Sequence, residues 1–318
     1  MGYEKKKILI LFLFLVIFPV MTNYIPAISN YLEVMIFAGI FCLVTIGLSL
    51  LMGYAGQISL GHAAFLGIGA YSSGILTAKF GASPWVGIFA GIALSSAVAI
   101  IVGIPSLKLK GHYLAMATLG FGEIVFIVFN EEVNLTGGPS GFADIPYLHI
   151  GSFEFSSEIS YYILVWSVVL LGLFFALNLI HSRVGRAWKA IHGNELAAEA
   201  MGVPTSKYKL KIFVLSSIYA SIAGSLYTHY ICFLNPSSFD LFWSIKFVMM
   251  VIVGGMSSVW GAIIGTILLT YLGNEWLTAF KHFDVLVYGF ILLLITMFLP
   301  GGIVSLPDII KSKRTGNR

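Results

Sequence analysis

The sequence predicts an all-α polytopic membrane protein with about eight to ten membrane-spanning helices, and three observations support this fold class. The 318 residues are 58% hydrophobic and 10% charged, with a mean hydropathy of +0.94, whereas soluble domains carry about 25% charged residues. Apolar runs of roughly 20 residues follow one another, and each is long enough to cross about 30 Å of hydrocarbon. The runs are continuously apolar rather than alternating, which favours helices over the strands of a membrane barrel.

We expect ten membrane segments along the chain. The third and eighth are rich in glycine, so each is expected to be either a simple span or a broken, re-entrant helix. The predicted segments are 8–27, 32–52, 57–79, 85–104, 112–130, 159–181, 210–232, 243–258, 260–280 and 285–300.

The first segment, 8–27, follows three lysines and resembles a secretory signal peptide. Its end carries no convincing small-residue cleavage site, because Tyr24-Ile25-Pro26-Ala27 matches that pattern poorly. We therefore expect residues 8–27 to remain as an uncleaved first membrane helix.

A glycine-rich stretch, Gly53–Phe65, reads GYAGQISLGHAAF and leads into the third segment. Polar side chains stand among the glycines, and irregular backbone at membrane depth is tolerated only where it lines a cavity or is buried in protein. Two interpretations are open: these residues line a translocation path, or they provide helix–helix hydrogen bonds and close packing. The candidate path residues are Gly53, Gln57, Ser59, Gly61 and His62.

Small residues recur at every fourth position in three later segments, which predicts close approach of helix backbones in lipid. A weak likeness between the stretches Gly53–Gly74 and Gly254–Gly265 also suggests an internal repeat, and paired interrupted segments often mark a substrate path. The small-residue positions are Gly87, Gly91 and Ser95; Ser217, Ser221 and Ser225; and Gly261 and Gly265.

The longest predicted loop, 131–158, contains five acidic residues and no lysine or arginine. Its stretch Asn134–Gly141 reads NLTGGPSG, and three glycines with a proline predict a tight, ordered turn. The turn either receives a partner protein or simply caps the preceding helix. The candidate partner-facing residues are Thr136, Gly137, Gly138 and Gly141.

The loop 182–209 is too polar for lipid and carries a short helix with its own boundaries. Asn194 is a good N-cap, and Gly202 suits the position after the last turn, with Pro204 beyond it. A helix of about two turns is marginal in water and needs a surface to pack on. A soluble partner, the protein's own inner face and anionic lipid headgroups all fit. The apolar stripe consists of Leu196, Ala197, Ala200 and Met201, with Glu195 and Glu199 at its border.

Catalytic chemistry is not indicated, because the chain has no P-loop, no HExxH motif, no cysteine–histidine cluster and no nucleophile elbow. We expect no catalytic residue, no metal site and no ATP bound by this chain. Cys42 and Cys232 lie in apolar runs and are expected to pack. Three isolated charges, Glu123, Lys246 and Glu275, fall in or near spans, where an ionisable group is a functional candidate unless it lies at a helix end.

Fifteen of the 18 lysine and arginine residues lie at the N-terminus, at 108–110, at 183–211 and in the C-terminal tail. Lysine and arginine concentrate in cytoplasmic loops, so we expect both termini inside and the acidic loop 131–158 outside. Lys79, Lys246 and Lys281 are left for the outer side or its edge. Since the basic residues lie in short loops, the net charge of +4 does not indicate nucleic acid binding.

Four stretches together resemble the LivM-type permeases of branched-chain amino acid ABC importers, over about residues 35–305. They are Gly53–Phe65, Thr136–Gly141 (TGGPSG), Gly185–Gly202 (GRAWKAIHGNELAAEAMG) and Gly254–Gly265 (GGMSSVWGAIIG). The first and third are long and specific, and the four follow in the family's order. His192-Gly193 departs from the pattern, because a more basic pair is common there.

The resemblance implies a permease domain at 31–305, an N-terminal helix before it (1–30) and a basic cytoplasmic tail after it (306–318). It implies a type I-like importer in the cytoplasmic membrane of a prokaryote, with a second, LivH-type permease as partner. Two ABC ATPase subunits, which would hold ATP and Mg, would bind inside, and a substrate-binding protein outside. The loop 182–209 would then carry a coupling helix that docks on an ATPase. Its implied docking residues are Asn194, Glu195, Leu196, Ala197, Ala198, Glu199, Met201 and Gly202.

The expected function is therefore inward movement of leucine, isoleucine and valine by a non-enzymatic pore subunit in contact with lipid. The same machine carrying urea or short amides is a close alternative, because those permeases look alike. An ion-coupled secondary transporter is a further alternative. It would need a functional carboxylate at Glu123 or Glu275, and it would leave the capped helix unexplained.

Overall fold

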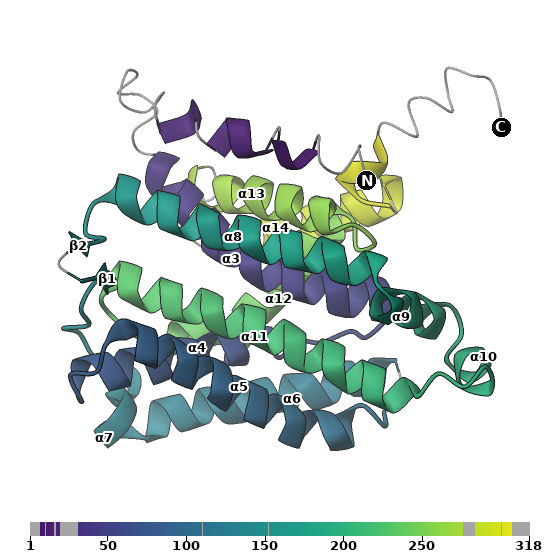
Figure 1. Ribbon diagram of the computed structural model, residues 1–318, viewed down its shortest axis with the longest axis horizontal. Helices are drawn as coiled ribbons and strands as arrows, with labels where there is room; N and C mark the ends of the chain where they lie inside the picture. The colour runs from purple at the N-terminus through teal and green to yellow at the C-terminus, as the bar shows by residue number, and fades with distance from the viewer. Residues whose placement is uncertain are drawn as a thin grey trace.

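The computed structural model describes residues 7–9, 11–15, 17–19, 31–109, 111–151, 153–275, 284–299 and 301–306. These residues form a bundle of long helices, with α10 (Glu195–Ala200) at one end and the hairpin of β1 (His149–Ile150) and β2 (Phe153–Glu154) at the other (Figure 1). We call these the α10 end and the hairpin end. Half of the predicted segment 8–27, including residues 20–27, and the tail beyond 306 lie outside the described residues.

The predicted all-α polytopic fold is confirmed, because seven helical spans of the described chain are long and apolar enough to cross a membrane. Helix boundaries differ from the predicted ones by a few residues. The long helices are α3 (Tyr31–Ser49), α5 (Pro84–Ser106), α6 (His112–Glu131), α8 (Glu158–His181), α11 (Thr205–Ile231), α12 (Leu241–Gly254), α13 (Val259–Glu275) and α14 (Asp284–Phe298), with α4 (His62–Ala78) beside them.

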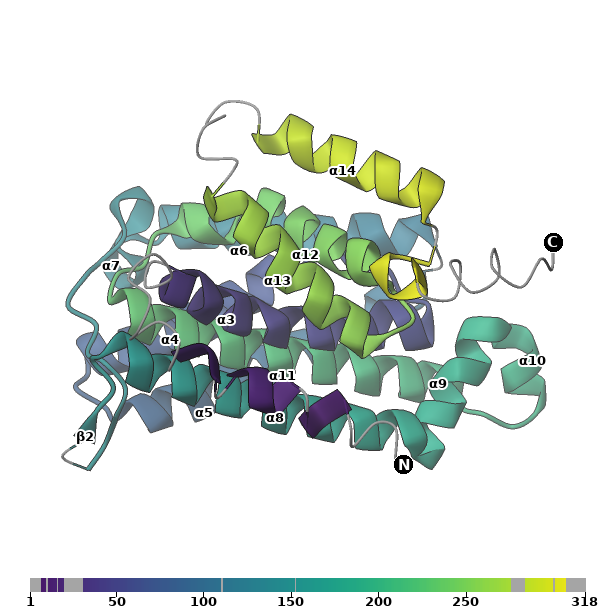
Figure 2. The ribbon, with the colours of Figure 1, turned by 90° about the horizontal axis from the view of Figure 1, so that it is seen from above.

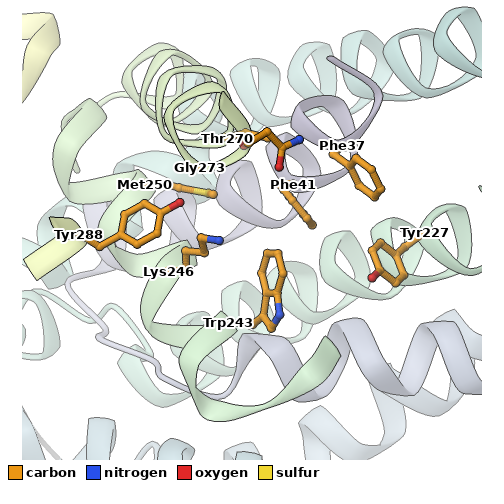
Figure 3. Close-up of a pocket in the computed structure, with 10 residues that line it drawn as sticks. Phe37, Phe41, Tyr227, Trp243, Lys246, Met250, Thr270, Gly273 and Tyr288 are labelled. Atoms are coloured by element: carbon orange, nitrogen blue, oxygen red, sulfur yellow. The ribbon is translucent and has the colours of Figure 1, made fainter. Parts of the chain in front are cut away.

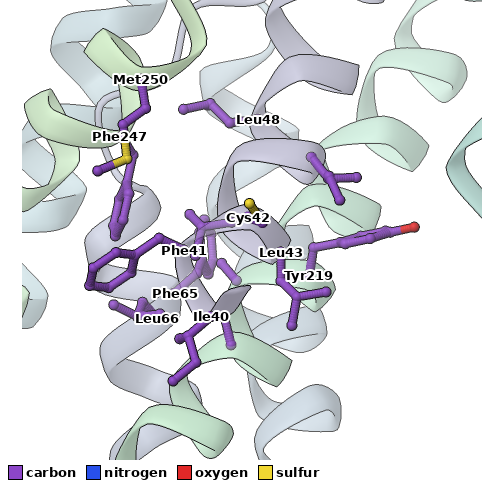
Figure 4. Packing of buried hydrophobic residues seen from close by; sticks show 14 of the residues in the cluster. Ile40, Phe41, Cys42, Leu43, Leu48, Phe65, Leu66, Tyr219, Phe247 and Met250 are labelled. Atoms are coloured by element: carbon purple, nitrogen blue, oxygen red, sulfur yellow. The ribbon is translucent and has the colours of Figure 1, made fainter. Parts of the chain in front are cut away.

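Helix α3 lies at the centre of the bundle. In the span Tyr31–Tyr54, 94% of the residues in its most apolar 18-residue stretch are buried, whereas the share for α6 is 22%. The side chains of α3 pack against α4, α11 and α12, as Phe41 does with Phe247 (Figure 4). Cys42 is fully buried in this core, which confirms its predicted packing role. Seen from above, α14 lies at the edge of the bundle, beyond α12 and α13 (Figure 2).

The predicted small-residue faces lie at close helix contacts. In α5, Gly87, Gly91 and Ser95 are buried on one face. Between α4 and α11, a Cβ on Gly224 would lie 1.9 Å from the Leu66 carbonyl oxygen. Glycine is therefore required for these two backbones to approach each other.

The two glycine-rich predicted spans are shortened by non-helical backbone at one end, and the helix in each is continuous. The third begins at His62 instead of residue 57, because the chain before α4 is not helical. The eighth consists of a 3-10 turn, η3 (Pro236–Phe239), then α12, and it ends in a turn at Gly255. The loop 131–158 contains α7 (Val133–Thr136), η2 (Gly138–Ser140) and the small hairpin, which the sequence did not predict.

We expect Gly224→Val to destabilise the protein, because the added Cβ alone would overlap a backbone oxygen of α4 that cannot move aside. Overpacking costs about 1–3 kcal/mol or more, so the melting temperature of the solubilised protein should fall by about 5 °C or more. The matched control is Gly120→Val in α6, where nothing lies within 4 Å of an added Cβ. Equal melting temperatures for the two variants would contradict the close contact.

Candidate functional site

Helix α3 ends in a π-helical turn, η1 (Leu50–Tyr54), after which residues 56–61 run without helix into α4. Gly56 has a positive φ of 66°, a conformation that favours glycine. π-helical turns are frequent at functional sites. We call residues 50–61 the α3 break.

The α3 break packs directly on the turn between α12 and α13. A Cβ on Gly53 would lie 1.8 Å from the Met256 carbonyl oxygen, and the Ser49 hydroxyl donates to the same oxygen at 3.3 Å. The two glycine-rich stretches that the sequence suggests as an internal repeat therefore meet here. Glycine is needed at 53 because the two backbones are in contact.

Three of the predicted path residues lie between helices. The His62 ring contacts the Ser59 hydroxyl through Nδ1 and the Ser216 hydroxyl of α11 through Nε2, both at 3.1 Å. Gly61 lies against α6, where a Cβ would be 2.6 Å from the Thr118 carbonyl oxygen. These contacts fix the helices around the break and correspond to the packing interpretation of the motif.

Gln57 is different, because it borders a cavity of about 170 Å³ at the α10 end. Its side chain is 3% exposed, and neither polar atom of its amide has a protein hydrogen-bond partner. Gly56, His192, Glu195 and Lys209 also line this cavity. Polar groups of this kind are typically satisfied by water or solute.

The loop after α8 folds as two short helices. Helix α9 (Arg183–Gly193) begins at a Ser182 cap and buries Gly185, Trp188 and Ile191. The Trp188 indole Nε1 donates to the Tyr208 carbonyl oxygen at 3.1 Å, which holds α9 against the start of α11. The basic residues of α9 are thereby left on its outer side.

The predicted boundaries of the short helix are confirmed. The Asn194 Oδ1 accepts from the Ala197 amide at 3.0 Å, as an N-cap does. At the other end, Gly202 has a φ of 83°, its amide donates to the Glu199 carbonyl, and the Val203 amide donates to the Ala198 carbonyl. These two bonds form a Schellman motif.

The predicted docking residues lie on two sides of α10. Leu196 and Met201 are 69% and 85% exposed, and Ala197, Glu199, Gly202 and Asn194 are exposed with them. Ala198 is only 5% exposed, so it packs against the protein itself. Glu195 forms an ion pair with Lys209 of α11 at 2.5 Å, which attaches α10 to the bundle.

Two contacts join this loop to the α3 break. The His192 Nδ1–H donates to the Gly53 carbonyl oxygen at 2.9 Å, and the ring lies against Gly56. The Lys189 ammonium lies 5.7 Å from the centre of the Tyr54 ring. His192, where the sequence departs from the family's pattern, therefore makes a direct hydrogen bond between the two motifs.

At the hairpin end, the turn 134–141 is held against α6 and against the segment that follows α11. The Thr136 hydroxyl donates to the Phe129 carbonyl at 2.7 Å, and a Cβ on Gly141 would lie 1.9 Å from the Leu234 carbonyl oxygen. Thr136 and Gly138 are buried. The exposed side chains here are their neighbours, including Val133 and Leu135.

The isolated charges differ in position. Glu123 is exposed on α6, whereas Lys246 lies among aromatic rings of the bundle. The side chain of Glu275 lies outside the described residues. No group of three or more metal-ligating side chains is found in the part of the chain that the structure describes.

Comparison with known proteins matches the chain to one family of membrane permeases. The chain matches the family described as the permease component of the branched-chain amino acid transport system, over residues 30–296. It is 30% identical over 290 residues to the high-affinity branched-chain amino acid transport system permease protein LivM of Salmonella typhimurium, covering 84% of this chain and 68% of that protein. It is 25% identical over 325 residues to a probable LivM permease of Methanocaldococcus jannaschii, covering 87% and 94%.

A second type of permease is also similar. The LivH permease of Salmonella typhimurium is 26% identical over 295 residues, covering 85% of this chain and 93% of that protein. No solved structure matches the chain at a significant level. The family match spans most of the chain and includes the α3 break and the loop that carries α10. The chain therefore belongs to the family of membrane-spanning permease components of branched-chain amino acid transport systems.

Proposed function

We propose that the chain is one of two related permease subunits of an ATP-driven importer, and that it moves branched-chain amino acids across the cytoplasmic membrane of a prokaryote. The observation that carries the proposal is the exposed apolar face of α10, formed by Leu196 and Met201, on a loop that is tied directly to the α3 break. Two exposed apolar side chains on a short, capped helix need a partner surface.

The partner that fits is an ATPase subunit. The α10 end carries the basic residues of α9, whereas the hairpin end carries Glu131 and Glu132, and this asymmetry supports a cytoplasmic position for α10 with both termini inside. ATP and Mg would be held by two ATPase subunits, because this chain has no P-loop. A LivH-type permease would be the second membrane subunit, as the similarity to both permease types supports.

The contacts of α10 support rigid-body coupling. When an ATPase moves α10, the Glu195–Lys209 ion pair transmits the movement to α11, and the His192–Gly53 hydrogen bond transmits it to the α3 break. The break then shifts against the α12–α13 turn and changes access to the cavity beside Gln57. Small displacements are amplified in this way because packed interfaces have discrete arrangements.

The hairpin end would receive an extracytoplasmic binding protein. Thr136 and Gly141 hold the turn 134–141 against neighbouring segments, so exposed Val133, Leu135 and the adjacent acidic residues would make the contact. An ion-coupled mechanism is not supported, because proton relays use linked ionisable groups. Among the described residues, the Glu123 carboxylate has no ion-pair partner.

We expect the complete assembly in proteoliposomes to take up labelled leucine only when ATP is present on the side of α10. Labelled urea should not accumulate. If the assembly takes up urea in the presence of ATP but does not take up leucine, the proposed substrate is wrong and the ATP-driven mechanism is retained. Leucine uptake by this chain alone under an ion gradient would overturn the ATP-driven assignment.

We expect Leu196→Asp with Met201→Asp to detach the ATPases, because two charges would enter an apolar interface without partners. Neither side chain is buried in this chain, so folding should be unaffected. The fraction of ATPase that co-purifies with the permease should fall about tenfold or more. The matched control, Leu196→Met with Met201→Leu, keeps the face apolar and should retain the ATPases; equal retention by both pairs would contradict docking through α10.

We expect His192→Phe to reduce leucine uptake per ATP hydrolysed by about twofold to tenfold, the range that corresponds to one net hydrogen bond. The ring is kept while the link to Gly53 is lost, so the ATPases should stay bound. His181→Phe is the control, because the His181 side chain is exposed and its ring donates to the Leu177 carbonyl oxygen of its own helix, α8. A normal ratio of uptake to hydrolysis in His192→Phe would exclude this link as the route of coupling.

A further inference from the structure

A second cavity, of about 230 Å³, lies between α3, α11, α12, α13 and α14 (Figure 3). Tyr227 in its wall is one turn before the end of α11, whereas α10 precedes the start of that helix. The cavity therefore lies toward the hairpin end, on the side from which an importer receives its substrate. None of the candidate path residues of the sequence motifs lines it.

The cavity contains a cation in an aromatic surround. The Lys246 ammonium lies 4.5 Å from the centre of the Trp243 ring and 4.9 Å from that of Tyr288. The distribution of basic residues in the sequence left Lys246 for the outer side of the membrane or its edge, and in the structure its head group is among these rings (Figure 3). A charge within a span is costly and is usually functional, and aromatic faces reduce that cost.

The rest of the wall is apolar with few polar groups. Phe37, Phe41 and Met250 provide the apolar part. Thr270 also lines the cavity, and its buried hydroxyl has no protein hydrogen-bond partner. An apolar pocket with a small number of placed polar groups is typical of a small-molecule site.

We propose that this cavity is a transit site for an aliphatic α-amino acid, in which Lys246 binds the carboxylate and Phe37, Phe41 and Met250 contact the side chain. Ammonium–carboxylate hydrogen bonds are charge-assisted and therefore strong. The volume is below the roughly 300–1,000 Å³ of sites for drug-sized ligands, which suits a single amino acid. A neutral amide such as urea would gain little from the ammonium or from the apolar wall.

This inference rests on the proposed function, so its test must distinguish failure of the proposed site from failure of the proposed function. Asn274 lines the cavity and is exposed, and Asn274→Cys provides a reporter. The background is Cys232→Ser, and Cys42 is kept because it is fully buried. Ser237→Cys, at an exposed position outside the cavity, is the control reporter.

The assembled transporter in nanodiscs, without binding protein, is treated with a maleimide in the presence of leucine, leucinamide or urea. We expect leucine to slow modification of Asn274→Cys about threefold or more, as a bound ligand that excludes the reagent would, and to leave Ser237→Cys unaffected. Leucinamide, which lacks the carboxylate, and urea should give no protection. Equal protection by leucine and leucinamide, or none by leucine, would overturn the site.

The same assembly is then tested with Lys246→Met. Protection by leucine in nanodiscs should disappear, and ATP-driven leucine uptake by the complete assembly in proteoliposomes should fall about tenfold or more, because a charge-assisted bond is lost. Lys246→Arg should retain most uptake, and Lys108→Met, at an exposed lysine outside the cavity, should match the wild type. If the wild type takes up leucine and Lys246→Met takes it up equally well, the proposed site is refuted but the proposed function is not. If the wild type itself takes up no leucine, the proposed function is refuted.

Discussion

The contact between Gly53 and the Met256 carbonyl is the constraint on which the arrangement of the α10 end depends. A side chain at 53 would overlap that backbone oxygen, so the end of α3 and the α12–α13 turn can meet only at glycine. The break that follows releases carbonyl oxygens that a continuous helix would satisfy internally. One of them, Gly53 O, accepts from His192, and this bond joins the end of α3 to the loop that presents α10.

The features that could be predicted from the sequence are those that depend on residues close together in the chain. The cap at Asn194 and the left-handed Gly202 depend on bonds within a few residues, so both ends of α10 follow from residue types alone. Small residues at every fourth position likewise identified real helix contacts. Contacts between distant parts of the chain were not predictable. The burial of Ala198, the ion pair of Glu195 and the position of Lys246 each depend on another helix.

The polar residues of the Gly53–Phe65 motif show why composition alone left two interpretations open. His62 is satisfied on both ring nitrogens by Ser59 and Ser216, which makes it a fixed cross-link between helices. Gln57 lies only five residues earlier, yet its buried amide has no protein partner and borders a cavity. Packing and lining therefore occur side by side in one motif, and only the neighbouring helices decide which applies to each residue.

An unpartnered polar group does not by itself mark a solute site. Ser95 and Ser221 also lack hydrogen-bond partners, but they lie at close contacts between helices, where small size is the property that matters. Thr270 differs because it borders a cavity that also contains the Lys246 ammonium and an aromatic wall. A buried polar group indicates solute binding when space, charge and apolar surface meet at the same place, and in the described chain α12 and α13 bring these three together.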